Sequence, residues 1–406
     1  MSAHPVRRRV CRRMLVPAFG LVAALTALLP GESLAVDPSP VPASTQALPR
    51  VAPDSFYAAG GVVDAGPAGE ILAQVELVAP AGIRKWAVIY RSTGYAGAPV
   101  AVSGLIVAPA APVAAGAPPR TVLSIAHATT GLADACAPSR QPSDGLVDTA
   151  LPLLEQGYVL AVTDYEGLGT PGAHPYIVGA SEGHSVLDAA RVAAAMPGTG
   201  AGSTVVLLGG SQGGHAVLWA ADLAATAAPD LDVVGAVAFA PAGDLEAIAA
   251  FDRSAAAGPD AWSSAVTLVA AWNEVYGLPL DVLTPAAQAL VPELSTRCSV
   301  HIDSQPTVVD LRTLPEWQAR LEENTPAATR TSVPVLIFQG DADQVVPLDS
   351  TRSMVARMCA VGDVVDLRVL PGADHPASVN PASVLAAITW VSERLAGTPV
   401  TSTCAG

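Results

Sequence analysis

The spacing of apolar positions changes once along the chain, and the change separates two kinds of predicted structure. Between Ile71 and Ala108 apolar and polar residues alternate, with a break at residues 94–99. A period of two residues is typical of β-strands, and a short break between two such runs is typical of a turn between antiparallel strands. We therefore expect an antiparallel meander at the start of a sheet.

From residue 121 onward, continuous apolar runs alternate with helical patterns. Strands that are apolar on both faces, each followed by a helix, are typical of a mostly parallel sheet covered on both sides. The expected strands are Thr121–Ala126, Tyr158–Thr163, Thr204–Leu208, Val233–Ala240, Val333–Phe338 and Val364–Leu370. The expected helices are Asp144–Glu155, Glu182–Met196, Gly213–Thr226 and Pro381–Leu395.

The alternation stops between residues 245 and 330, where amphipathic stretches such as Ala265–Tyr276 and Trp317–Glu323 are separated by prolines. Helical periodicity broken in this way predicts a mainly helical cap inserted late in the sheet. The expected α/β core then comprises residues 53–244 and 331–406, with the cap at 245–330.

The N-terminus has the pattern of a secretory signal peptide. Five arginines between Arg7 and Arg13 precede an apolar run from Met14 to Leu29, and small residues follow up to Ala35. This order predicts a cleaved segment at 1–35. A retained membrane anchor is the alternative, although the run is somewhat short for a span. Residues 36–52 are rich in Pro, Ala and Ser, which predicts a flexible mature N-terminus.

Charge and cysteine content agree with secretion. The formal net charge of −15 argues against nucleic acid or an anionic membrane surface as a partner, and no obligate protein partner is implied. Removal of the leader leaves four cysteines, an even number that suits an oxidising compartment. Of the three pairings, we favour Cys136–Cys298, which would attach the cap to the core, and Cys359–Cys404, which would hold the C-terminal tail. Metal-ligand spacings such as C-x-x-C and H-E-x-x-H are absent, so we expect neither metal nor cofactor.

The candidate chemistry centres on Gly209-Gly210-Ser211-Gln212-Gly213, which matches the G-x-S-x-G nucleophile elbow. An apolar strand pattern precedes this motif and a helical pattern follows it. That context predicts a sharp turn that presents the Ser211 hydroxyl above the sheet, as in the α/β-hydrolase fold.

A serine nucleophile needs a general base, which in this fold comes after the acid in chain order. His375 directly follows the strand pattern at 364–370, at the sheet edge where ligands bind in open α/β folds. It is the expected base. His215 on the nucleophile helix is expected to be structural, and His301 falls within the cap.

Asp343 is the expected acid because it follows the strand at 333–338 within a G-x-x-D-x-x-V-P pattern. Asp341 is the main alternative, although it suits a turn-bracing role. Asp374 is a weaker one, since a residue rarely reaches the ring of its neighbour.

An oxyanion hole needs two main-chain N–H groups aimed at the developing charge. We expect Gln212 to supply one and Thr129, in the loop after strand 121–126, to supply the other, with Thr130 and Ala128 as alternatives. The segment Asp164–Thr170 is expected to form a further loop at the top of the sheet. It either lines the site or caps a neighbouring helix.

From Ile71 to its C-terminus the chain resembles the secretory lipase family of α/β-hydrolases. The resemblance rests on the segments Arg91–Thr93, His127–Ser139, Asp164–Thr170, His174–Tyr176, Gly209–His215, Gly340–Pro347 and Gly372–Pro376. It implies a triad of Ser211, Asp343 and His375, a helical lid, two disulfides and hydrolysis of carboxylic esters. One departure is Ala128, where many bacterial relatives have the first glycine of H-G-T-T-G. If that glycine needs a positive φ, Ala128 would be strained.

The sequence therefore predicts a secreted serine lipase or esterase that cleaves acylglycerols or other lipid esters through an acyl-enzyme. An apolar cap suits an acyl chain and a contact with a lipid–water interface. The alternatives are an acyltransferase with the same triad, a silent lipid-binding homologue and, less favoured, a peptidase.

Overall fold

The computed structural model of this protein describes residues 48–61, 63–141 and 144–405. The predicted signal peptide lies outside the described residues, as does most of the segment after it. The described end of that segment is packed against the core, because Pro49 accepts a hydrogen bond from the Val78 amide and Ala52 is buried.

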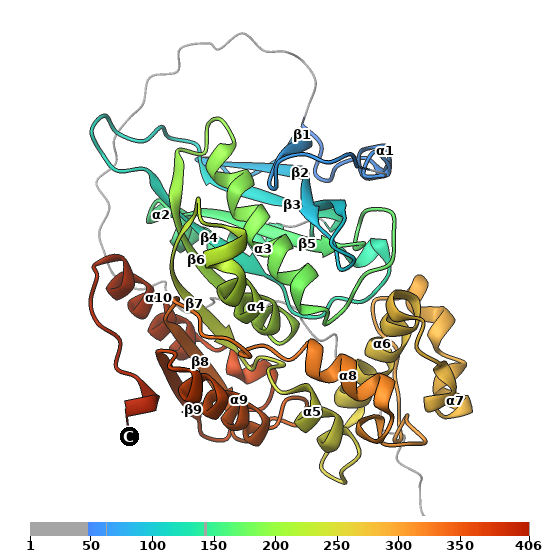
Figure 1. The fold of residues 1–406 in the computed structure, drawn as a ribbon. Coiled ribbons are helices and arrows are strands. Elements are labelled where there is room, and N and C mark those ends of the chain that lie inside the picture. The colour runs from blue at the N-terminus through green and yellow to red at the C-terminus, as the bar shows by residue number, and fades with distance from the viewer. Residues whose placement is uncertain (1–47, 62, 142–143, 406) are drawn as a thin grey trace, which may run out of the picture.

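One nine-stranded sheet runs through the core in the order β1-β2-β3-β5-β4-β6-β7-β8-β9 (Figure 1). The strands are β1 Ile71–Leu77, β2 Ile83–Thr93, β3 Pro99–Pro109, β4 Arg120–Ala126, β5 Val159–Glu166, β6 Ala201–Gly210, β7 Asp232–Phe239, β8 Val335–Gly340 and β9 Val365–Leu370. Strands β1 to β3 pair antiparallel, which confirms the predicted meander. Strand β3 meets β5 antiparallel, and β4 to β9 form the expected parallel part.

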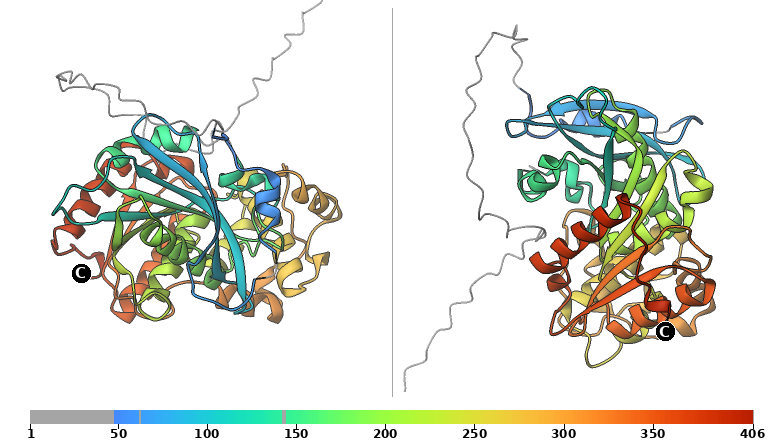
Figure 2. Two further views of the ribbon diagram at one scale, coloured as in Figure 1. Left: turned by 90° about the horizontal axis from the view of Figure 1, so that it is seen from above. Right: turned by 90° about the vertical axis from the view of Figure 1, so that its left-hand side faces the viewer.

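Helices cover both faces of the sheet (Figure 2). Each face has its own apolar core. The helices of the core are α1 Asp54–Ala58, α2 Asp144–Glu155, α3 Gly179–Ala195, α4 Gln212–Ala227, α9 Leu348–Val361 and α10 Pro381–Leu395. Helices α3, α4 and α9 pack on one face, and α1, α2 and α10 on the other. The fold prediction, a mostly parallel sheet between two helical layers, is confirmed.

Helix α9 was not among the predicted helices. Its buried face includes Ser350 and Thr351 besides Met354, Val355 and Met358. The two hydroxyl residues interrupt the apolar period that marks a helix in a sequence. Packing against the sheet stabilises this helix despite the weak pattern.

The segment between β7 and β8, which we call the cap, is mainly helical and lies beside the core (Figure 1). Its helices are α5 Leu245–Asp252, α6 Pro259–Tyr276, α7 Pro285–Gln288 and α8 Pro315–Glu323, with short 3-10 turns between them. The cap has a separate apolar core in which the rings of Trp272 and Trp317 stack 6.0 Å apart.

Both favoured disulfide pairings are present. Cys136 bonds to Cys298 and so links the loop after β4 to the cap. Cys359 on α9 bonds to Cys404 and holds the end of the chain. Among the helices of the described ranges, none has the length and apolar character needed to span a membrane.

Candidate active site

Ser211 lies at the turn between β6 and α4, with φ of 55° and ψ of −117°. An L-residue rarely adopts this backbone conformation, and such strain is concentrated at functional sites. The Ser211 amide donates to the carbonyl oxygen of Phe239 on β7 at 2.8 Å, which fixes the turn to the sheet. The local geometry is that of a nucleophile elbow.

The glycines of the motif leave space for this turn. A Cβ atom on Gly209 would lie 2.1 Å from the Gly213 carbonyl oxygen, and one on Gly213 would lie 2.0 Å from the Ala126 carbonyl oxygen. Both contacts are with rigid main chain, so a side chain cannot be accommodated. Gly210 has no such restriction, since the nearest atom to its Cβ position is 3.6 Å away.

A continuous chain of hydrogen bonds joins Ser211, His375 and Asp343. The Ser211 Oγ lies 3.0 Å from His375 Nε2. His375 Nδ1 lies 2.8 Å from Asp343 Oδ2. The three residues follow β6, β9 and β8, so parallel strands bring them to the same edge of the sheet. With Nδ1–H donated to the carboxylate, Nε2 is free to accept the serine proton.

The carboxyl group of Asp343 accepts several hydrogen bonds that fix its position. Its side chain is fully buried, and its Oδ1 accepts the amides of Val345 and Val346, each at 2.8 Å. Gln339 Nε2 donates to Oδ2 at 2.9 Å. Gln339 itself is buried on β8, and its Oε1 accepts from Thr351. Sequence reasoning missed Gln339; its one signal was a polar residue at the end of an apolar strand.

The other acid and histidine candidates have structural contacts. Asp341 Oδ1 accepts the Gly372 amide at 2.6 Å and so ties the loop after β8 to the loop after β9. Asp374 accepts the Ala377 amide. His215 is buried and its Nδ1 lies 2.7 Å from Glu182 Oε2. His301 pairs with Asp303 on the cap surface.

The loop after β4 packs directly against the elbow, because the Ala126 and His127 carbonyl oxygens lie where a Gly213 side chain would be. The Thr129 hydroxyl is 2.9 Å from the Tyr176 hydroxyl, which anchors this loop. In the described ranges the main-chain amides of Gln212 and Thr129 make no hydrogen bond to protein. Both are therefore free to bind a ligand oxygen, although the assignment of Thr129 as the second oxyanion donor stays a prediction.

A buried network holds the Gln212 side chain. Its Nε2 donates to Glu182 Oε1 at 2.8 Å and to His174 Nε2 at 3.2 Å. His174 Nδ1 faces the Glu166 carbonyl oxygen, and burial lowers the pKa of His174 to about 4. His174 is therefore neutral at pH 7 and accepts from Gln212. Sequence reasoning did not give Glu182 or His174 this role.

Ala128 does not strain the loop. Ala128 is not one of the described non-glycine residues that have a positive φ. The left-handed conformation in this loop belongs to Gly131, with φ of 123°. A Cβ atom on Gly131 would lie 2.7 Å from the Cys298 Cα atom, so this glycine permits the close approach of the cap.

The expected loop at Asp164–Thr170 begins later than predicted, and none of its residues lines the pocket. Strand β5 continues through Glu166, and both acids are buried. Asp164 accepts hydrogen bonds from Ser103 and from the Ser139 amide, and burial raises its pKa to about 6. The prediction failed for the two acids because polar residues at the end of a strand resemble a loop in the sequence. Here neighbouring hydroxyl groups form hydrogen bonds with the buried carboxyl groups.

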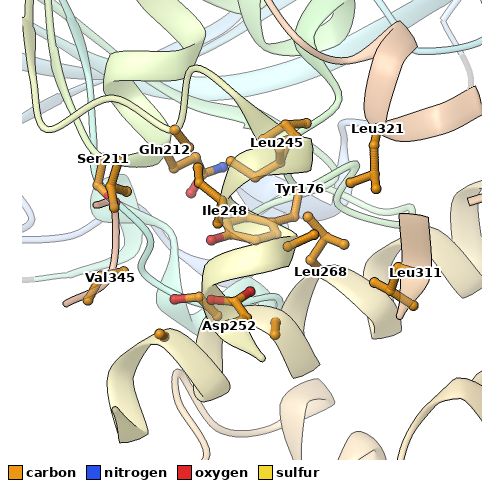
Figure 3. A pocket seen from close by; sticks show the side chains of 17 residues that line it. Tyr176, Ser211, Gln212, Leu245, Ile248, Asp252, Leu268, Leu311, Leu321 and Val345 are labelled. Carbon is orange, nitrogen blue, oxygen red and sulfur yellow. The ribbon is translucent and has the colours of Figure 1, made fainter. Parts of the chain in front are cut away.

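A pocket lies between the elbow and the cap, and Ser211 forms part of its wall (Figure 3). Most of the wall is apolar. Its residues are Tyr176, Ile177, Ser211, Gln212, Ala242, Leu245, Ile248, Ala249, Asp252, Ala261, Ser264, Ala265, Leu268, Leu311, Leu321, Val345 and Val346. Within the described ranges, no group of three His, Cys, Asp or Glu side chains could hold a metal ion. The arrangement thus offers a nucleophile, a base and an apolar binding cavity.

Comparison with known proteins places this site in a family. A probable inactive lipase of Mycobacterium tuberculosis is 27% identical over 345 residues, which cover 77% of this chain and 74% of that protein. Lipase A of Moesziomyces aphidis is 28% identical over 232 residues, or 52% of this chain and 48% of the lipase.

The closed structure of Candida antarctica lipase A matches 84% of this chain and 85% of its own with a TM-score of 0.68. At 21% identity this likeness supports the α/β-hydrolase fold. The sequence profile of the secretory lipases matches residues 147–301 and 308–403, which is more than half of the chain. The chain therefore belongs to the secretory lipase family.

Proposed function

We propose that this protein is a secreted serine hydrolase of carboxylic esters, with lipid esters as its substrates. The observation that carries the proposal is the hydrogen-bonded series Ser211–His375–Asp343 at the wall of an apolar pocket. Family membership supports ester hydrolysis, and the two disulfides support an extracellular location.

In the proposed mechanism, Ser211 Oγ attacks the ester carbonyl carbon while His375 Nε2 accepts its proton. Asp343 holds the imidazole in the productive orientation and stabilises the imidazolium. The developing oxyanion binds the amides of Gln212 and Thr129. His375 then protonates the leaving alcohol, and a water molecule releases the acid from the acyl-enzyme by the reverse sequence of proton transfers.

Two alternatives use the same scaffold. An acyltransferase would pass the acyl group to an alcohol in place of water, and it needs no different triad. A silent homologue would bind lipid without turnover, and the mycobacterial relative is named a probable inactive lipase. The complete triad geometry favours an active enzyme over the silent one.

The test is hydrolysis of p-nitrophenyl esters, from acetate to palmitate, by the mature protein and by Ser211→Ala. We expect kcat/KM to fall by about 10⁴-fold or more in the variant. Measuring product partition between water and added glycerol separates hydrolase from acyltransferase. A folded wild-type protein without activity on any ester would contradict the proposal and favour the silent homologue.

A further inference from the structure

The wall of the pocket contains one residue of unexpected chemistry, Asp252. It is the last residue of α5, and the residues of α5 that line the pocket are Leu245, Ile248, Ala249 and Asp252. Their spacing of three, four and seven residues defines one helical face. An aspartate therefore occupies a position where the pattern calls for an apolar side chain. Figure 3 shows it beside the pocket with Ile248, Leu268 and Tyr176.

Among the described residues, the carboxyl group of Asp252 has no hydrogen-bond partner. Its Oδ1 atom is buried and unpaired, and no other pocket residue in the described ranges has a buried unpaired side-chain polar atom. The neighbouring Arg253 directs its guanidinium to Thr307 and the Val309 carbonyl oxygen. Trp262 donates to the main-chain oxygen of Asp252 and leaves the carboxyl group unpaired.

The surroundings favour the neutral form of this acid. Burial raises the pKa of Asp252 to about 8, with no opposing charge nearby. The C-terminal end of a helix also disfavours a negative charge. A protonated carboxyl group both donates and accepts a hydrogen bond, so it suits a neutral polar group of a ligand better than a cation.

The other polar side chains of the wall are already paired. The Tyr176 hydroxyl meets Thr129, and the Ser264 hydroxyl donates to the Asp260 carbonyl oxygen. Asp252 is thus the one polar side chain of the described pocket wall that makes no hydrogen bond within the protein and can give all of its hydrogen bonds to a ligand. A plain alkyl chain would leave that group unsatisfied, which weakens its binding.

We propose that the pocket accepts acyl chains that carry a hydroxyl group, and that Asp252 binds this hydroxyl, so that esters of hydroxy acids are preferred over esters of unsubstituted fatty acids. We assign the hydroxyl to the acyl part because that part stays bonded to Ser211 after the alcohol leaves. The inference rests on the proposed ester hydrolysis, and it adds the substrate class.

The test compares matched p-nitrophenyl esters of equal chain length that end in a methyl, a hydroxymethyl or an aminomethyl group. The series runs from four to twelve carbons, so that the hydroxyl reaches different depths. We expect the hydroxy ester to exceed the plain ester in kcat/KM by about tenfold at one chain length. Asp252→Leu should reverse this preference, and Asp252→Asn should keep part of it. Ser264→Ala is the control in the same wall and should leave the ratio unchanged.

Equal rates for hydroxy and plain esters at every length, or an unchanged ratio in Asp252→Leu, would overturn the inference. Preference for the amino ester would also overturn it, because an ionised Asp252 would then bind a cation. A binding measurement keeps the inference separate from the proposed catalysis. The ethyl ester of the hydroxy acid should raise the Tm of the Ser211→Ala protein more than the ethyl ester of the unsubstituted acid does. This difference would persist even if Ser211 were not the nucleophile.

Discussion

Glu182 Oε1 accepts a hydrogen bond from Gln212 Nε2 at 2.8 Å, so a buried carboxylate on α3 positions the residue that follows the proposed nucleophile. The main-chain amide of Gln212 is the expected oxyanion donor, and this hydrogen bond holds the side chain of the same residue. The same Glu182 pairs with His215 one helical turn further along α4. Two contacts from one carboxylate thus fix the start of the nucleophile helix.

We therefore expect Gln212→Leu to lower kcat by about tenfold with little change in KM. This is less than the roughly 10²-fold or greater loss that follows deletion of an oxyanion donor, because the main-chain N–H remains. Steady-state kinetics on a soluble ester, with Tm as the control for folding, provide the measurement. A raised KM with unchanged kcat would mean that the side chain only contacts substrate.

The elbow glycines allow a matched pair of substitutions. Gly213→Ala would bring a Cβ atom within 2.0 Å of the Ala126 carbonyl oxygen, whereas Gly210→Ala meets nothing closer than 3.6 Å. We expect Gly213→Ala to destabilise the protein by about 3 kcal/mol and to abolish most activity. Gly210→Ala should change stability by about 1 kcal/mol or less. Chemical denaturation and esterase assays compare the two, and equal effects would argue against the packing account of the motif.

The same conservative change, aspartate to asparagine, distinguishes the role of Asp343 from that of Asp341. Asp343→Asn removes the acceptor that orients His375 and should lower kcat by about 10⁴-fold. Asp341→Asn only weakens the contact with the Gly372 amide, so it should cost about 1 kcal/mol of stability and leave kcat within a few fold. Should Asp341→Asn prove the more damaging to kcat, the assignment of the acid would be reversed.

Burial of Asp252 predicts a dependence of stability on pH. Its pKa is about 8 in the folded protein against 3.8 for an unperturbed aspartate, so the folded state holds a proton that the unfolded state loses. Stability then falls as pH rises from about 4 to about 8, by at most about 1.4 kcal/mol per pH unit. Tyr176, the other titratable group of the pocket wall, has a pKa of about 12 and does not ionise in this range.

Thermal unfolding of wild type and Asp252→Asn between pH 5 and 9 tests this prediction. The difference in Tm between the variant and wild type should grow in favour of the variant as pH rises. The difference should become constant above pH 8. Asp164 and Asp222, whose pKa values burial raises to about 6, affect both proteins equally and cancel in the difference. A constant Tm difference would show that Asp252 ionises normally.

The three residues of the proposed triad could be chosen from sequence because each follows a strand of the parallel sheet. Chain order and strand ends were enough to choose Ser211, Asp343 and His375, and the geometry brings these three together. Contacts between distant segments could not be read in this way. Glu182 meets His215 across 33 positions, and nothing in the pattern of either helix indicates that pairing.

Asp252 illustrates a second limit of sequence reasoning. The pattern at 245–252 predicts an amphipathic helix, in which an aspartate at the end is normally solvated. The burial of its Oδ1 atom depends on where α6 and residues 311 and 321 pack around the pocket, which the local sequence does not specify. Helix α9 was missed for a related reason, since its hydroxyl residues are buried only by tertiary packing.

We propose that Ser211 is a nucleophile activated by His375. The most direct measurement is intact-protein mass spectrometry after treatment with an alkyl fluorophosphonate, followed by peptide mapping. We predict one adduct per protein on Ser211, and slow or absent labelling in His375→Ala, since Ser211 then lacks its general base. Labelling at another residue, or equal labelling rates in wild type and His375→Ala, would contradict the account.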